Sequence, residues 1–327
     1  MLFSDRVYGP VEIDEPVLLD LMQTHAMRRL DGVLQHGISG LIGITNRTTR
    51  FEHSAGVMIL VRRWGGSLAE QIAALLHDVS HTAFSHVIDY VFGGHDSQGY
   101  HEEKKEEFMA ASDLPETLAR HSYDWRDFLH EEDYPLLEQP APALCADRLD
   151  YFLRDSRDLG LATSDQVRFA LDHLIVHAGR IAADDVDAAR WMAYTYLEAD
   201  RVSWANFREV GLYELTARAI QTALRIGAID ESDFWGTDDV LWEKLRAVKD
   251  AAFQSQLDLI SPRTQFVRDE AAPTFLVSTK LRTIDPDVLA NGQSRRLSEI
   301  DAEFARRRVE YLERNRGKWP MRVVPSV

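Results

Sequence analysis

Three histidines and one aspartate lie within ten residues of this chain, in the segment HDVSHTAFSH at positions 77–86. The adjacent pair His77 and Asp78 offers a neutral imidazole nitrogen and a carboxylate oxygen, a standard mixed ligand set for a divalent transition metal. Cys145 is the single cysteine, which argues against a structural zinc site built from thiolates. Two ligands do not make a site, so the others must come from other segments.

Two further segments carry residues of the same kind. Upstream, RFEHSAGVMILV places His53 three residues after Arg50, near the start of an apolar-faced helix. Downstream, ALCADRLDYFLRDS contains four functional groups within roughly 100° of arc on one helix. They are Asp147, Arg148, Tyr151 and Asp155. Such a face suits a ligand better than a core, because unpaired charges are costly to bury.

Helices must position these groups, since apolar residues recur at helical spacing along most of the first 226 residues. The pattern predicts helices over 16–35, 53–64, 68–77, 84–92, 101–111, 143–159, 166–178 and 187–226. Residues 5–14 are typical of a short hairpin or extended arm. The sequence therefore predicts a mainly α fold with a short N-terminal hairpin.

The residue pattern changes after about residue 260, where short strand-like runs occur, notably Phe275–Ile284. A final helix rich in Arg and Glu is predicted near 294–314. We expect three parts: a core at 1–165, a helical extension packed on it at 166–260, and a small mixed α/β C-terminal subdomain at 261–327.

Charge and composition exclude several classes of function. The 327 residues include 53 acidic and 37 basic ones, giving a formal charge of −16 that disfavours stable duplex nucleic-acid binding. A local basic pocket for one small phosphorylated ligand is compatible with that charge. No apolar run approaches the roughly 20 residues of a membrane span, and the N-terminus lacks signal-peptide features. With one cysteine and no expected membrane contact, the predicted compartment is the cytoplasm.

The motifs RFEHS.GV, LLHD..H..FSH and DYF.RDS, in this order, resemble the HD-domain phosphohydrolases. The most similar branch is the deoxynucleoside triphosphate triphosphohydrolases, and the resemblance runs from VYGPVEID to GLAT, roughly half of the chain. It implies an HD-domain helical core within residues 1–165. It also implies that one divalent transition metal is bound by His53, His77, Asp78 and Asp147.

The same resemblance implies roles for other polar residues. Phosphate oxygens would be held by Arg50, Arg148, His81 and His86. The catalytic group would consist of His81, Asp89 and His101. In that group Asp89 would pair with His101, which would protonate the leaving oxygen. Sugar contacts would come from Gln35, Tyr151 and Asp155.

Ordinary structural roles stay open for some of these residues. Tyrosines often cap cores and aspartates often cap helices, which applies to Tyr151 and Asp155. Cys145 is interpreted as structural, because on one helix it would be rotated roughly 160° from Asp147. The tryptophans, including Trp191 and Trp204, are interpreted as core residues.

The chain departs from the family pattern at two places. The usual HDxGHGPFSH is here HDVSHTAFSH, so Ser80, Thr82 and Ala83 replace two glycines and a proline. Asp31 stands where the tetrameric branch carries an arginine implicated in regulatory nucleotide binding. We therefore do not expect the same nucleotide activation. Residues after 195 do not match the base-reading part of the family, which leaves base and sugar specificity open.

These residues predict a metal-dependent phosphohydrolase of nucleotides, with deoxynucleoside triphosphates favoured and metal-activated water attacking phosphorus. The alternatives are a nucleotidase or small phosphomonoester phosphatase with the same metal site, and, ranked last, a non-catalytic nucleotide-binding regulator. The ligand mixture accepts Mn²⁺, Fe²⁺, Co²⁺, Ni²⁺ or Zn²⁺, and Mg²⁺ would accompany the substrate phosphates. A homo-oligomer is compatible with the helical surface after residue 166.

Overall fold

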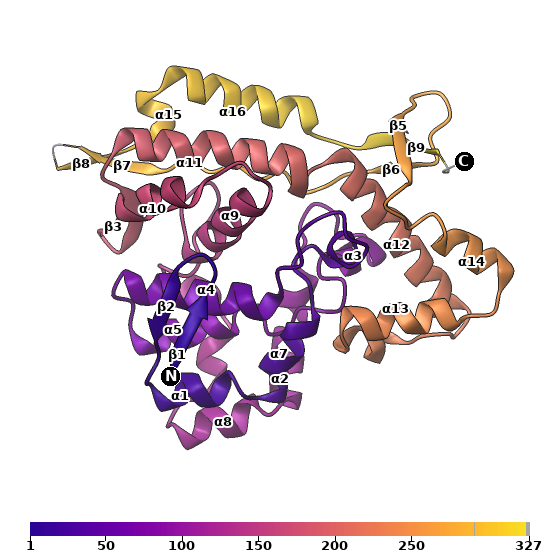
Figure 1. The fold of residues 1–327 in the computed structure, drawn as a ribbon, viewed down its shortest axis with the longest axis horizontal. Coiled ribbons are helices and arrows are strands. Elements are labelled where there is room, and N and C mark those ends of the chain that lie inside the picture. Colours follow the sequence, from indigo (N-terminus) through magenta and orange to yellow (C-terminus); the bar gives the residue numbers. More distant parts are fainter. Residues whose placement is uncertain (291, 325–327) are drawn as a thin grey trace.

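The computed structural model describes residues 1–290 and 292–324 and is mainly helical, with an N-terminal hairpin and small C-terminal sheets (Figure 1). This confirms the predicted fold class. The hairpin consists of β1 (Leu2–Asp5) and β2 (Gly9–Glu12), which pair antiparallel with Leu2 opposite Glu12. Within the described ranges, no helix is long and apolar enough to cross a membrane.

The helical core follows the hairpin. Its elements are α1 (Pro16–Leu21), α2 (His25–Arg29), η1 (Leu30–Gly32), α3 (Gly37–Leu41), α4 (Arg50–Arg63), α5 (Leu68–Leu76), α6 (Val87–Val91), α7 (Tyr100–Ala111), α8 (Leu114–Arg120), η2 (Trp125–Phe128), η3 (Glu131–Asp133) and α9 (Ala146–Asp158). The prediction of one helix over 16–35 is wrong. The side chain of Thr24 caps α2 by accepting from the Met27 amide, which restarts the helix after a break.

Helix α4 is the centre of this core and packs against both α5 and α9. It begins three residues earlier than predicted because Thr49 and Glu52 form a capping box. The Thr49 hydroxyl accepts from the Glu52 amide at 3.1 Å, and the Glu52 carboxylate accepts from the Thr49 amide at 2.9 Å. The cap fixes the start of the helix that carries Arg50 and His53.

The segment predicted as two helices over 166–178 and 187–226 is interrupted twice. Helix α10 (Ser164–Asp172) ends before a strand, β3 (Leu174–His177), that pairs with β4 (Arg180–Ala183). Ile175 and Val176 are β-branched, which favours a strand over a helix there. Helix α11 (Val186–Ala199) runs into a π-helical turn, η4 (Asp200–Trp204), before α12 (Phe207–Arg225).

A second hydrophobic cluster joins the HDVSHTAFSH segment to α12. Buried Phe84, Val87 and Ile88 belong to the same cluster as Ile220 and Phe234. The elements that complete it are η5 (Glu231–Trp235), α13 (Asp238–Ala247) and α14 (Ala251–Leu257). Helix α12 of the helical extension thus packs against α6.

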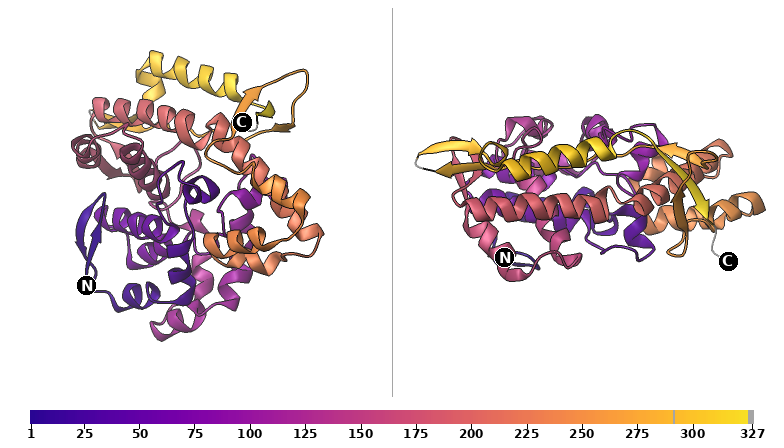
Figure 2. Two further views of the ribbon diagram at one scale, coloured as in Figure 1. Left: turned by 45° about the vertical axis from the view of Figure 1, so that its right-hand side comes forward. Right: turned by 90° about the horizontal axis from the view of Figure 1, so that it is seen from above.

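The C-terminal segment forms two small sheets and one long helix. Strands β7 (Asp287–Ala290) and β8 (Gln293–Arg296) extend the β3–β4 hairpin, with β7 parallel to β4. Strands β5 (Gln265–Arg268) and β6 (Phe275–Val277) flank β9 (Trp319–Val324). Helices α15 (Leu297–Ile300) and α16 (Ala302–Asn315) follow β8, and α16 lies along α11 (Figure 2).

Two C-terminal predictions are only partly right. The strand predicted over 275–284 ends at Val277, and residues 278–286 run without regular structure. The helix predicted near 294–314 begins later because residues 293–296 pair with β7. Residues from all three predicted parts, such as Leu60, Met192 and Phe304, share one hydrophobic cluster. The division at 165 and 260 stays a prediction.

Candidate metal centre and active site

A cavity of about 800 Å³ lies where α4, α5, α9 and the residues of 278–286 meet. Its wall contains every residue to which the sequence assigned metal or substrate binding: Gln35, Arg50, His53, His77, Asp78, His86, Asp147, Arg148, Tyr151 and Asp155. His81 and His101 also line it, whereas Asp89 lies behind His86. The volume is in the usual range for a small-molecule site.

The four predicted metal ligands converge. Nε2 of His53 lies 3.2 Å from Nε2 of His77 and 3.0 Å from Oδ1 of Asp147. Asp78 Oδ2 lies 3.6 Å from His53 Nε2, and Asp78 Oδ1 lies 3.5 Å from His77 Nε2. Ligand atoms of His53, His77 and Asp147 lie within 4.8 Å of one another, and with Asp78 beside both histidines this donor set fits a divalent transition metal.

The outer nitrogens of both histidines are already engaged. His53 Nδ1 lies 2.7 Å from a carboxylate oxygen of Asp150, and His77 Nδ1 donates to the Ala74 carbonyl at 2.8 Å. These bonds leave each Nε2 as the ligand atom, which is the usual arrangement around metal-binding histidines. Asp150 is a functional residue that the sequence reasoning missed, although it lies one helical turn after Asp147.

Electrostatics at the centre favour a cation. Burial lowers the pKa of His77, but Asp78 and Asp147 outweigh it and raise that pKa to about 10. Burial raises the pKa of Asp147, yet hydrogen bonds from His53 and His77 hold it well below its usual range. The carboxylates are therefore ionised, and their negative charge favours a cation among these side chains.

A second cluster contains His81, His86 and His101, whose nitrogens come within 4.8 Å of one another. The rings of His81 and His101 stack at 3.8 Å. Burial, the largest cause, lowers the pKa of His86 to about 4 and that of His101 to about 3. These lowered pKa values favour neutral imidazoles in the free protein, and the role of His101 as a general acid stays a prediction.

The predicted pair of Asp89 with His101 is not formed. The Asp89 carboxylate instead lies 3.1 Å from Nδ1 of His86 and accepts from the Tyr100 amide at 2.9 Å. His86 and Asp89 are three residues apart at the start of α6, which brings the two side chains together. Asp89 therefore orients His86.

The loop that departs from the family pattern has its own anchor. Ser80, in place of a glycine, is buried and donates its hydroxyl to the His101 carbonyl at 2.9 Å. Phe84 and Ser85 adopt positive φ values of 63° and 50°. Gly37 approaches closely, since a Cβ there would lie 2.3 Å from the Phe84 carbonyl oxygen. The loop is thus tied to α7 on one side and to α3 on the other.

Residues 50–155 match the HD domain family. The metal-dependent phosphohydrolase cns2 of Cordyceps militaris is 36% identical over 300 residues, covering 90% of this chain and 86% of that protein. This chain belongs to the HD-domain metal-dependent phosphohydrolases. The uncharacterized protein YdhJ of Bacillus subtilis is 41% identical over 289 residues, covering 88% of each chain.

Solved structures share the fold of this HD-domain protein. A phosphohydrolase from Bacteroides thetaiotaomicron superposes with a TM-score of 0.69 at 17% identity over 100% of both chains. A protein from Aquifex aeolicus gives a TM-score of 0.68 at 20% identity over 93% of both. Deoxynucleoside triphosphate triphosphohydrolase SAMHD1 of Danio rerio is 33% identical over 106 residues, 28% of this chain and 17% of that protein. The family is confirmed, but the likeness to the triphosphohydrolase branch is partial.

Both predicted phosphate-binding arginines of the HD domain make protein contacts. Arg50 is buried and donates from Nη1 to Asp78 at 2.6 Å and from Nε to the Ser85 hydroxyl at 3.1 Å. Arg148 donates to the Ala143 carbonyl at 2.7 Å and to Glu138 at 3.1 Å. Arg50 therefore also orients a metal ligand, while the phosphate contacts of both stay predictions.

The three predicted sugar contacts line the cavity, and the side chains of Tyr151 and Asp155 are engaged by protein groups. The Tyr151 hydroxyl is paired with that of Tyr196. Asp155 is fully buried, and its carboxylate lies 3.1 Å from His36 Nε2 and accepts from the Trp204 indole at 2.6 Å. The aspartate thus holds the cavity wall together, and its direct contact with a sugar stays a prediction.

Sequence reasoning missed several wall residues of the HD-domain cavity. Trp204, interpreted as core, lines the cavity with Tyr196, Glu209, Lys280 and Arg282. The first three follow the end of α9 by 38 residues or more, and the two cations lie in the irregular segment after β6. A π-helical turn places Trp204 there, and such turns often occur at functional sites.

Glu209→Gln is expected to stabilise the protein more at pH 8 than at pH 5. Burial raises the pKa of Glu209 to about 7, whereas a glutamate in an unfolded chain has a pKa of about 4.3. Between those two pKa values the unfolded chain binds fewer protons than the folded protein. The contribution of Glu209 to stability therefore falls as pH rises and is fully lost above pH 7. Urea unfolding of both proteins at the two pH values measures the difference, at about 1.4 kcal/mol per pKa unit.

The matched control is Glu106→Gln on the exposed side of α7. The difference in free energy of unfolding between this variant and the wild-type protein should be the same at both pH values. If Glu209→Gln also gave a pH-independent difference, the raised pKa would be refuted.

Proposed function

We propose that this phosphohydrolase acts on nucleotides, with deoxynucleoside triphosphates as the first candidates. The supporting observation is that one cavity joins the metal centre to an aromatic wall. The Tyr151 ring lies 6.3 Å from that of His53, and the rings of Trp204 and Tyr196 follow at 4.9 and 6.1 Å from Tyr151. Such a wall provides apolar area for a sugar and a base next to a phosphate site.

The metal would be held by His53, His77, Asp78 and Asp147. A divalent cation bound there would lower the pKa of a bound water and polarise the phosphorus. The ligand set accepts Mn²⁺, Fe²⁺, Co²⁺, Ni²⁺ or Zn²⁺. In this proposal, water is activated at the wall of the cavity formed by α4, α5 and α9.

Positive charge for the phosphates would come from two sides of the cavity. Arg148 lies on α9, while Lys280 and Arg282 lie on the segment after β6, and all three line the cavity. Burial and the neighbouring Arg282 lower the pKa of Lys280, as expected for cations gathered without a bound anion. Guanidinium groups match phosphate oxygens in geometry and neutralise charge that develops during transfer.

The histidine cluster would serve the leaving group. His86, oriented by Asp89, and His101, stacked on His81, are neutral and half-buried in the free protein. A phosphate chain placed against them would raise their pKa values and supply the conditions for protonating the departing oxygen. The proton would then move from an imidazole nitrogen to the oxygen that leaves phosphorus.

The deciding experiment incubates the purified protein with Mn²⁺ and a panel of nucleotides, with phosphorus NMR as the readout. Release of intact triphosphate from deoxynucleoside triphosphates is the expected result and indicates attack at the α-phosphorus. Stepwise release of orthophosphate, or activity on monophosphates alone, would replace the proposal with the nucleotidase or phosphomonoesterase alternative. Tight nucleotide binding without any product would favour a regulator.

A further inference from the structure

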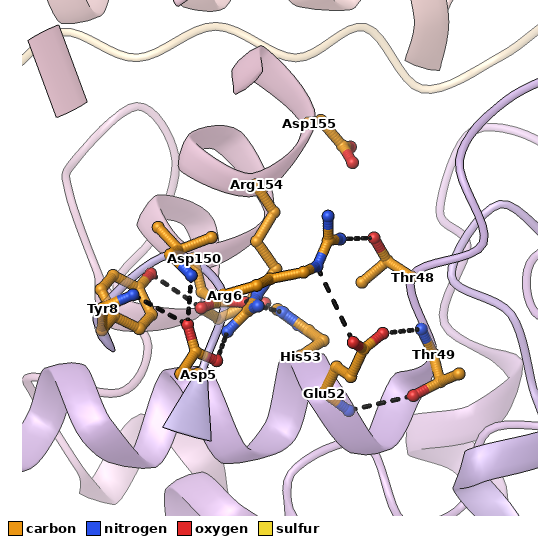
Figure 3. Close-up of polar contacts among 12 residues, drawn as sticks. Asp5, Arg6, Tyr8, Thr48, Thr49, Glu52, His53, Asp150, Arg154 and Asp155 are labelled. Atoms are coloured by element: carbon orange, nitrogen blue, oxygen red, sulfur yellow. Dashed lines mark hydrogen bonds and ion pairs between the residues drawn. The ribbon is translucent and has the colours of Figure 1, made fainter. Parts of the chain in front are cut away.

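A line of buried charged and polar groups connects the N-terminal hairpin to the metal ligand His53 (Figure 3). At the end of β1, Asp5 accepts from Nη2 of Arg154 at 2.6 Å. Arg154 donates from Nε to Oδ2 of Asp150 at 2.7 Å, and the same oxygen lies 2.7 Å from Nδ1 of His53. Arg154 and Asp150 are 0% exposed, so the contacts are shielded from water.

Tyr8, in the hairpin turn, fixes the other oxygen of Asp150. Its hydroxyl donates to Oδ1 at 2.7 Å. Three groups thus engage two carboxylate oxygens, which sets the rotation of the carboxylate beside His53. Asp5 orders the turn in the same way, because its Oδ1 accepts from the amides of Val7 at 2.7 Å and Tyr8 at 2.9 Å. The turn and the buried network are therefore one unit.

Helix α4 is shaped to admit this network. Gly56 lies one helical turn after His53, and a Cβ on it would come within 2.0 Å of both Arg154 Nη2 and Asp150 Oδ1. Neither atom has room to retreat, since both side chains are fully buried. A glycine at this position lets α9 bring Asp150 against His53.

The charges explain why the hairpin matters to His53. Arg154 is shared by two carboxylates, Asp5 and Asp150. Without Asp5 the buried guanidinium has Asp150 as its remaining charged partner, and Arg154 competes with His53 for one oxygen of that residue. Loss of the hairpin contact would therefore weaken the bond that orients the imidazole.

We propose that the N-terminal hairpin, through Asp5 and Tyr8, is a positioning element for the metal ligand His53. The hairpin precedes residues 50–155, the part that matches the HD domain. The inference rests on the metal centre and on no particular substrate.

The test compares Tyr8→Phe and Asp5→Asn with the wild-type full chain. Metal-free protein is titrated with Mn²⁺ in a calorimeter, and its thermal midpoint without metal is recorded in parallel. We expect Mn²⁺ to bind both variants about 10-fold more weakly, as is typical when the hydrogen-bond partner of a metal-binding histidine is disturbed. Tyr8→Phe preserves the ring and its packing, so it remains a test if Asp5→Asn does not fold.

Arg6→Ala is the matched control, because Arg6 lies in the same turn as Tyr8 but contacts Asp158 at 2.8 Å and Glu52 at 3.8 Å instead of Asp150. It should lower the thermal midpoint and retain the wild-type affinity for Mn²⁺. Wild-type affinity in Tyr8→Phe overturns the proposal. An equal loss in Arg6→Ala also overturns it, because hairpin docking alone would then account for the effect. Failure of the proposed nucleotide substrate would leave these results unchanged, since no substrate is present.

Discussion

His77→Ala is expected to give a folded protein without stoichiometric metal and with turnover lowered by about 10³-fold or more. Nε2 of His77 lies 3.2 Å from that of His53 and 3.6 Å from Oδ1 of Asp147, at the middle of the ligand set. The residue follows the last residue of α5, so its loss leaves the packing of α4 on α5 in place. Elemental analysis of the purified protein and the turnover rate at saturating Mn²⁺ measure the two effects.

The control for this variant is His177→Ala on the exposed strand β3, outside the cavity wall. It should retain both metal and turnover. Far-ultraviolet circular dichroism of His77→Ala must match the wild-type spectrum for the comparison to hold. Full metal content and full turnover in His77→Ala would place the metal centre elsewhere.

The four predicted metal ligands came from the family resemblance, and the structure places each of them at the end of a helix. His53 lies in the first turn of a capped helix, His77 and Asp78 at the end of the next helix, and Asp147 in the first turn of α9. Arg148, one residue after Asp147 and about 100° further round the helix, also lines the cavity.

The residues that support those ligands were not predictable in the same way. Asp150 and Arg154 are four residues apart on α9. The partner that offsets the cost of burying them is Asp5, 149 positions before Arg154. Sequence patterns treat a charge in a helix as a mark of solvent exposure, and only the folded chain shows the counter-charge.

Asp89 shows the opposite situation. Its partner His86 lies three residues earlier, at the N-cap of the same helix, a spacing that brings the two side chains into contact. The family resemblance pointed to His101 instead. The short range pattern was the better guide here, because the start of α6 is fixed by backbone geometry whereas the position of α7 depends on tertiary packing.

In the segment after β6, the sequence pattern did not predict the structure correctly. Its alternating sequence predicts a strand through residue 284, yet pairing with β9 ends at Val277. The chain then crosses the cavity, where Asp200 accepts from the Arg282 amide at 3.0 Å. A contact with the π-helical turn thus replaces a sheet partner, which no local pattern reveals.

Arg50→Ala is expected to destabilise the metal-free protein by about 3–5 kcal/mol, the usual cost of removing one partner of a buried ion pair. Arg50 is 4% exposed and Asp78 also 4% exposed, with 2.6 Å between Nη1 and Oδ2. A bound divalent cation supplies positive charge to Asp78, so the loss should be smaller in the metal-loaded protein. Urea unfolding with and without Mn²⁺ measures both values.

Turnover separates the two roles of Arg50, because a ligand-orienting arginine and a phosphate-binding arginine respond differently to substitution. Loss of a cation that acts on charge developing in the transition state costs about 10²–10³-fold in kcat, whereas loss of uniform substrate binding raises KM alone. Arg50→Lys keeps the charge but not the fork that reaches both Asp78 and Ser85, so it should restore stability more than kcat. Arg47→Ala, exposed and three residues upstream, is the control. An Arg50→Ala protein with wild-type stability and kcat would show that Asp78 is held by other groups.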